Sequence, residues 1–425
     1  MAEVPIQRHA LDNGLRIVLS RDPRAPLVAV NLWYDVGSKH ERAGKTGFAH
    51  LFEHMMFQGS AHVEKGQHFS MVQAAGGTLN ASTWLDRTNY FETLPGHELE
   101  LALWLESDRM ASLLPAMTQE KLDNQRDVVK NERRYSVDNQ PYGDWDERIQ
   151  GLVFPDDHPY HHSTIGSMED LSAASLDDVG EFFATYYAPN NAVLTVAGDF
   201  EPDHALEAIG RYFGPIPRNE TLPAPPDMTL PASLGGAVRV TAPDQVPLPR
   251  IYLAHRIPPF GTDAFDRFDV AADVLSSGRA SWLYADLVRT QRLAQDVSVF
   301  VFPIVGGASM FVAWATAQQG VDPTTLETAL LAELDRLGTD GPTDADLERV
   351  RNLQASRSAA SLERISERAD RLSMYACLFD DPGRINEEVS RYAAVDAAQV
   401  AEAMRTGITE DNRVTLTYVP AEAAA

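Results

Sequence analysis

The sequence predicts an α+β protein made of two similar domains, and three observations support that prediction. Alternating apolar segments typical of strands are interleaved with segments of helical periodicity along all 425 residues. A proline-rich stretch at 215–234 interrupts both patterns, as a linker does. Segments after this stretch echo segments before it at an offset of about 221 residues. We therefore expect one domain at 1–214 and a second copy at 235–425.

Composition excludes several classes of function. The net charge of −25, from 36 basic and 61 acidic residues, argues against nucleic acid, whose phosphates require a basic surface. No apolar run approaches the length of a membrane span. The first residues show no apolar signal segment, so we expect a cytoplasmic protein as written, or a periplasmic one if a signal peptide was removed. The single cysteine, Cys377, excludes an internal disulfide and any multi-cysteine metal site.

The chain begins with a pattern typical of a β-hairpin. Residues 15–19 alternate in polarity, residues 21–24 contain a turn, and residues 27–34 form a second strand-like run. A polar loop at 37–45 then leads into a helix.

That helix carries two histidines and a glutamate in the order H-x-x-E-H, at His50, Glu53 and His54. Residues spaced i, i+3 and i+4 share one face of a helix, so all three side chains point the same way. Two imidazoles on one turn are a zinc-type pair, and a nearby carboxylate can deprotonate a water on the metal. The third ligand stays open at this point: a downstream carboxylate competes with His62, His68 and His97.

The segments that follow alternate between helix and strand. A helix near 70–75 ends at a Gly-Gly pair, and two Thr-rich strands flank a turn near residues 86–87. Helices are predicted at about 97–114 and 118–135. The second of these is strongly charged, and its residue types alone give Glu132 no more weight than Glu120 or Asp127.

Several motifs together resemble the pitrilysin/insulinase family of zinc peptidases. The helix motif is followed, 78 positions after His54, by Glu132 at the end of Val-Val-Lys-Asn-Glu. Further matches, in the family's order, are the segments at 77–83, 88–90, 141–143 and 187–192. The resemblance covers essentially the whole chain. It implies two similar α+β domains, each a mostly antiparallel β-sheet packed with helices, which form half of a clam-like peptidase.

The resemblance also implies roles for individual residues. His50, His54 and Glu132 match the family's ligands for Zn²⁺, and Glu53 matches the general base that activates the metal-bound water. Asn80 and Ala81 match a substrate-contacting pair on an edge strand, where an extended peptide adds as a further strand. Many members carry a supporting glutamate seven residues before the last ligand, and this chain has Gln125 there.

The second copy lacks the metal-binding residues. At the same offset, His50, Glu53 and His54 fall on apolar residues, namely Ala271, Val274 and Leu275. The family's transition-state clamp pairs an arginine with a tyrosine seven residues later. Here Arg289 or Arg292 stands for the arginine, but Gln295 occupies the approximate place of the tyrosine.

The resemblance therefore implies a particular branch and assembly. In the bacterial branch similar to mitochondrial processing peptidase, one subunit keeps the zinc motif and a homologous subunit carries the Arg/Tyr pair. We expect this chain to be the zinc-bearing subunit of such a heterodimer, a zinc endopeptidase acting on unfolded peptides or oligopeptides. The alternative is a non-catalytic assembly or binding subunit of a related complex.

Overall fold

The computed structural model describes residues 3–421, which form two compact units. Neither unit is one continuous stretch of chain. The first unit contains the chain up to Arg133 with His162–Pro226 and Ser358–Glu387; the second contains Arg134–His161, Asp227–Arg357 and the chain from Glu388 onward. Each unit thus includes a segment that lies, in sequence, within the other half. The predicted domain boundaries at residues 214 and 235 stay predictions.

The first unit is built on a six-stranded sheet of order β1-β2-β6-β3-β5-β4. Its strands are β1 (Gln7–Ala10), β2 (Arg16–Arg21), β3 (Leu27–Tyr34), β4 (Thr78–Thr83), β5 (Thr88–Pro95) and β6 (Ala192–Gly198). The predicted hairpin of β2 and β3 is wrong, because β6 lies between them, parallel to β2 and antiparallel to β3. Both strands are present, but a local turn signal cannot reveal a strand that inserts from more than 150 residues downstream.

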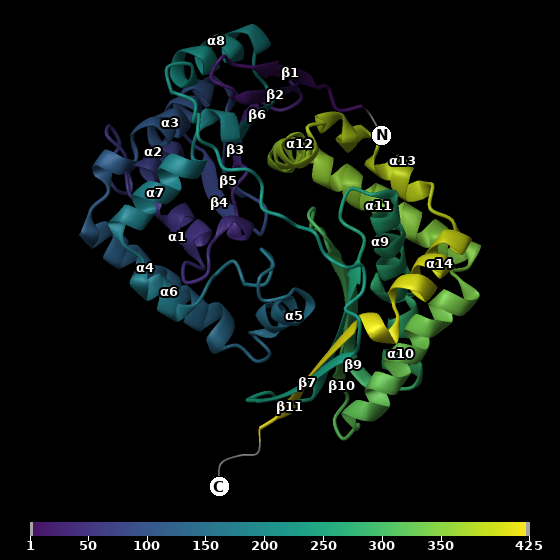
Figure 1. Ribbon diagram of the computed structural model, residues 1–425. Helices are drawn as coiled ribbons and strands as arrows, with labels where there is room; N and C mark the ends of the chain where they lie inside the picture. Colours follow the sequence, from purple (N-terminus) through teal and green to yellow (C-terminus); the bar gives the residue numbers. More distant parts are fainter. Residues whose placement is uncertain (1–2, 422–425) are drawn as a thin grey trace. The chain divides into compact units, whose positions relative to one another are not determined.

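Helices cover both faces of this sheet. They are α1 (Phe48–Met55), α2 (Gln67–Ala74), α3 (Leu99–Ser112), α4 (Gln119–Arg133), α6 (Met168–Ala173), α7 (Leu176–Tyr186), α8 (Pro202–Phe213) and α12 (Ile365–Phe379). Side chains alternate between the faces along each strand. On β3, Val30 and Leu32 join the core that includes α1 and α3, whereas Asn31 and Trp33 hydrogen-bond Asp370 of α12. Figure 1 shows α12 beside this sheet, although its colour places it late in the chain.

The second unit has a five-stranded sheet of order β7-β11-β8-β10-β9. Its strands are β7 (Val238–Asp244), β8 (Arg250–Ile257), β9 (Ala294–Phe302), β10 (Ser309–Ala317) and β11 (Arg413–Pro420). Taken in that order, their directions match those of β2, β6, β3, β5 and β4: the first pair is parallel and the rest are antiparallel. The predicted α+β fold class is confirmed, and one strand topology occurs in both sheets.

The helices of the second unit pack on both faces of its sheet. They are α5 (Trp145–Val153), α9 (Asp263–Ser276), α10 (Pro323–Asp340), most of α11 (Asp344–Glu363), α13 (Glu388–Ala393) and α14 (Ala397–Gly407). On α9, Ala271, Val274 and Leu275 are buried in the apolar core. The helix at the offset position is therefore present and packs by its apolar side chains.

Two further observations bear on the predictions. The stretch at 215–234 contains no helix or strand, as its proline content predicts. No helix within residues 3–421 combines the length and the apolar character needed to cross a membrane.

Candidate metal centre

Helix α1 presents His50, Glu53 and His54 on one side because its apolar residues determine how it packs. Its buried residues are Phe48, Ala49, Leu51, Phe52 and Met55. His50 and His54 face away from that core, with 13% and 21% of their side chains exposed. Their ring centroids are 4.8 Å apart. The predicted helical register of the motif therefore holds.

Helix α4 brings Glu132 to the same place. The Nε2 atom of His54 lies 3.4 Å from one carboxylate oxygen of Glu132, and Nε2 of His50 lies 3.8 Å from the other. The Glu132 side chain is 42% exposed, so solvent reaches the cluster. We call His50, His54 and Glu132 the open triad.

The spacing and chemistry of the open triad fit a zinc ion. A tetrahedral zinc with ligands about 2.0–2.1 Å away holds its ligand atoms about 3.3 Å apart. The distances of 3.4 Å and 3.8 Å are near that value, so small side-chain adjustments would close the site. Two imidazoles and one carboxylate are also a zinc donor set that leaves a fourth position for water.

The electrostatics of the two histidines differ. Burial, helped by the charge of His54, lowers the pKa of His50 to about 4, so its imidazole is neutral near pH 7. Burial also disfavours a charged His54, but its hydrogen bond to Glu132 and the charge of Glu53 outweigh that effect and raise its pKa. The same hydrogen bond lowers the pKa of Glu132. His50 is thus in the neutral form that binds a metal, and a metal at His54 competes with a proton for the imidazole.

Glu53 points to the end of the edge strand β4. The Thr83 hydroxyl donates a 2.6 Å hydrogen bond to its carboxylate. Burial raises the pKa of Glu53, although the Thr83 hydrogen bond and the charges of His54 and Arg87 oppose it. In the sequence Thr83 lies within the matching segment 77–83, but nothing local indicates its contact with a residue 30 positions earlier.

Asn80 and Ala81 both lie on β4. This strand pairs with β5 on one side and with no strand of the described chain on the other. Asn80 is exposed, and its side-chain oxygen accepts a 2.9 Å hydrogen bond from the backbone N–H of Ala81. The backbone N–H of Ala81 is therefore paired with the side chain of its neighbour on this edge strand.

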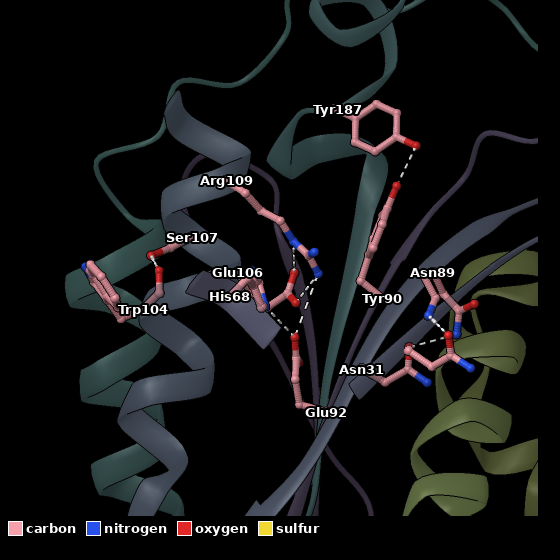
Figure 2. Close-up of polar contacts among 12 residues, drawn as sticks. Asn31, His68, Asn89, Tyr90, Glu92, Trp104, Glu106, Ser107, Arg109 and Tyr187 are labelled. Atoms are coloured by element: carbon pink, nitrogen blue, oxygen red, sulfur yellow. Dashed lines mark hydrogen bonds and ion pairs between the residues drawn. The ribbon is translucent and has the colours of Figure 1, made fainter. Parts of the chain in front are cut away.

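A second cluster of ligand-type residues lies within the same unit (Figure 2). His68 of α2, Glu92 of β5, and Glu106 and Arg109 of α3 form what we call the buried tetrad. The Nε2 atom of His68 is 3.3 Å from Glu92, and Nε of Arg109 donates to Glu106 over 2.9 Å. All four side chains are at most 6% exposed. A guanidinium already supplies the positive charge there, which argues against a metal ion.

The remaining histidines considered as third ligands are engaged elsewhere. His62 pairs with Asp108 at 2.5 Å, and His97 lies 3.6 Å from Glu98. Gln125, at the position of the family's supporting glutamate, is buried and hydrogen-bonds His54.

The clamp candidates lie in the second unit. Arg289 is exposed on a π-helical turn, Tyr284–Thr290. Arg292 is exposed and has a left-handed backbone, with φ of 56°. Gln295 is exposed on β9, at the edge of the second sheet. Their role stays a prediction.

Family models match two parts of this chain. A family model described as insulinase (peptidase family M16) matches residues 16–147, and one described as peptidase M16 inactive domain matches residues 173–354. The zinc protease PqqE of Helicobacter pylori is 30% identical over 88% of this chain and 84% of its own length.

Solved structures show the same fold. The crystal structure of a protease from H. pylori has a TM-score of 0.91 at 26% identity, with 99% of this chain and all of that chain covered. The periplasmic protease PqqL from Escherichia coli, at 18% identity, has a TM-score of 0.78 over 99% of this chain but only 48% of its own. The chain therefore belongs to peptidase family M16, the insulinase/pitrilysin family of zinc proteases.

Proposed function

We propose that this chain is a zinc metalloendopeptidase subunit that hydrolyses peptide bonds of unfolded peptides or oligopeptides. The observation that carries the proposal is the open triad, in which the Nε2 atoms of His54 and His50 lie 3.4 Å and 3.8 Å from the Glu132 oxygens, close to the spacing of about 3.3 Å in a tetrahedral zinc site. His50, His54 and Glu132 are the proposed ligands.

Glu53 is the proposed general base. Zinc, when bound, lowers the pKa of a water molecule and polarises the scissile carbonyl. The Glu53 carboxylate takes the proton from the attacking water and returns it to the leaving amine. The Thr83 hydroxyl holds one carboxylate oxygen, which fixes the orientation of the other. The raised pKa of Glu53 makes its carboxylate a better proton acceptor than an ordinary glutamate, as a general base requires.

The edge strand β4 is the proposed substrate-binding element. An extended peptide that pairs with Asn80 and Ala81 is held by main-chain hydrogen bonds, which require little side-chain specificity. Because Thr83 ends the same strand and contacts Glu53, such a peptide would pass beside the base and the open triad.

We further propose that a homologous subunit completes the enzyme. The chain spans 48% of PqqL, and Gln295 cannot replace the phenol of a tyrosine because an amide is not acidic. A homologous chain that lacks H-x-x-E-H but keeps the Arg/Tyr pair should raise peptide cleavage on mixing. If this chain alone cleaves as fast as the mixture, the heterodimer is wrong.

The decisive test uses Glu53→Gln and His54→Ala with a quenched fluorescent peptide. E53Q should retain one zinc per chain and lose about 10²- to 10⁴-fold in cleavage, because only proton transfer is removed. H54A should lose zinc as well as activity. Full activity of E53Q would make the base assignment wrong. Wild-type protein that stays metal-free when purified with zinc would favour the alternative, a non-catalytic assembly or binding subunit.

A further inference from the structure

The first turn of α1 is capped by a residue from outside the helix. Its N-cap, Gly47, has a φ of +83° and no side chain that could accept a hydrogen bond. The carboxylate of Glu41 instead accepts from the backbone N–H groups of Gly47, at 2.9 Å, and Ala49, at 2.7 Å. A negative charge at a helix N-terminus is favourable, and these N–H groups have no partner within the helix. Glu41 thus holds the start of the helix that carries His50 and His54.

Glu41 is itself held by His162. Its side chain is fully buried, and Nε2 of His162 lies 2.8 Å from the carboxylate oxygen that accepts from Gly47. Burial raises the pKa of Glu41, and the hydrogen bonds from His162, Ala49 and Gly47 oppose that rise. A buried carboxylate needs such partners, because an unpaired one is costly to bury.

His162 begins a segment, residues 162–170, that attaches to the start of α1 a second time. Asp170 accepts hydrogen bonds from the backbone N–H of Thr46, at 2.9 Å, and from its hydroxyl, at 2.6 Å. Gly166, with φ of +70°, lies so close to Gly47 that a Cβ at Gly166 would stand 2.3 Å from the Gly47 nitrogen. Only glycine fits there. We call residues 162–170 the brace.

The brace also holds the end of α4. Arg133, the residue after Glu132, donates a 2.7 Å hydrogen bond to the carbonyl oxygen of Gly166. One turn of backbone at Gly166 therefore contacts both the N-terminus of α1 and the C-terminal residue of α4. These two helices supply all three members of the open triad, and more than 60 residues separate them in sequence.

We infer that the brace, through Glu41 and His162 at α1 and Gly166 at α4, sets the separation between the two histidines and Glu132. The inference rests on the proposed zinc site. Glu41, His162 and Arg133 are positioning residues, since they touch the ligand-bearing helices and not the metal. Residues that orient metal ligands typically change metal affinity by 10- to 100-fold when altered.

The test measures zinc affinity of the full chain by competition with a chromophoric chelator. Glu41→Gln keeps the shape of the side chain but removes the charge and one acceptor for the helix N–H groups. We expect its zinc dissociation constant to rise about 10- to 100-fold while circular dichroism and cooperative unfolding of the metal-free protein are retained. The visible spectrum of the cobalt-substituted protein should also change, because it reports ligand geometry and not overall stability.

Two further variants keep the test decisive. Arg133→Met removes the hydrogen bond that attaches the end of α4 to Gly166, and it should also weaken zinc binding. This variant decides the test if E41Q does not fold. Arg42→Gln removes an exposed ion pair with Glu181 next to the same helix start and should bind zinc as the wild type does. Wild-type zinc affinity and an unchanged cobalt spectrum in both E41Q and R133M would overturn the brace. Absence of zinc binding by the wild type would instead overturn the proposed function.

Discussion

The open triad and the buried tetrad contain the same residue types, histidine and glutamate, yet they differ in exposure and in the source of positive charge. In the open triad, Glu132 is 42% exposed and lies beside two imidazoles. In the buried tetrad, Glu92 and Glu106 are at most 1% exposed, and the guanidinium of Arg109 lies among them. Arg109 also stacks over Tyr90, 4.2 Å from the ring centroid.

This difference shows how the fold separates a binding site from a structural ion cluster. A site that takes a metal from solvent must be reachable and must bring anionic or neutral donors together without a resident cation. A buried cluster of acids is stable only if a cation or protons accompany it. In the buried tetrad, Arg109 is the cation and pairs with Glu106. Glu106 and Glu92 hydrogen-bond each other, and burial raises the pKa of both carboxyl groups, which favours their protonated form.

The largest effect is expected from removing the cation of the tetrad. Arg109→Met leaves Glu106 and Glu92 buried without their guanidinium, and breaking a buried ion pair typically costs about 3–5 kcal/mol. Urea unfolding of the metal-free chain measures this loss. The matched variant Arg211→Met removes an exposed pair with Glu100 and should cost less than about 1 kcal/mol. Equal stabilities of the two variants would show that the tetrad does not depend on Arg109.

The second prediction asks which cluster accepts zinc. Free zinc at about 100 times the dissociation constant should raise the free energy of unfolding by about 2.7 kcal/mol, because it binds only the folded chain. His54→Ala should abolish this response, and His68→Gln should retain it. The assignment of zinc to the open triad is wrong if H68Q loses the zinc response while H54A keeps it.

The open triad was largely predictable from sequence, and the tetrad was not. The spacing of His50, Glu53 and His54 lies within one helical turn, so helix geometry alone places them together. Glu132 was only one carboxylate among several until the family resemblance selected it. The tetrad joins residues of α2, β5 and α3 that share no local pattern. His68 accordingly looked like a competing zinc ligand, because only tertiary packing brings it to Glu92 and Arg109.

The fold also has parts that the sequence predicts and parts that it does not. The topology of the second sheet agrees with the faint repeat, since a repeat compares segments of like local pattern. Two long-range features left no local signal: the insertion of β6 between β2 and β3, and the packing of α12 on the first sheet. Asp370 of α12 accepts hydrogen bonds from Asn31, Trp33 and Asn89, and this anchor is visible only in three dimensions.

A third prediction concerns pH. Burial, with the charge of Arg109, lowers the pKa of His68 to about 3, whereas an unfolded histidine has a pKa near 6.5. Below pH 6.5 the unfolded state therefore binds a proton that the folded state does not, so this stability is present above pH 6.5 and is lost as pH falls toward 3. At pH 5 the loss is about 2 kcal/mol.

The His68→Gln variant isolates this contribution. Urea unfolding at pH 7.5 and pH 5, with a chelator present, should show a decrease for wild type about 2 kcal/mol larger than for H68Q. The raised pKa values of Glu92 and Glu106 act with the opposite sign, and both carboxyl groups are present in both proteins. Parallel pH dependence of the two proteins would contradict a neutral, buried His68.

The smallest effect is expected from Gln125→Glu, which gives the open triad the carboxylate that many family members have. Gln125 is 7% exposed and hydrogen-bonds His54, so a carboxylate there would make His54 a more basic ligand. The gain is limited, because a further buried negative charge near Glu53 and Glu132 is itself unfavourable. We expect zinc to bind at most about tenfold tighter, or about 1.4 kcal/mol. Gln119→Glu adds the same charge at an exposed position of α4 and should leave zinc affinity unchanged. Weaker zinc binding by Q125E would mean that the amide, and not an acid, is the better partner for His54 in this chain.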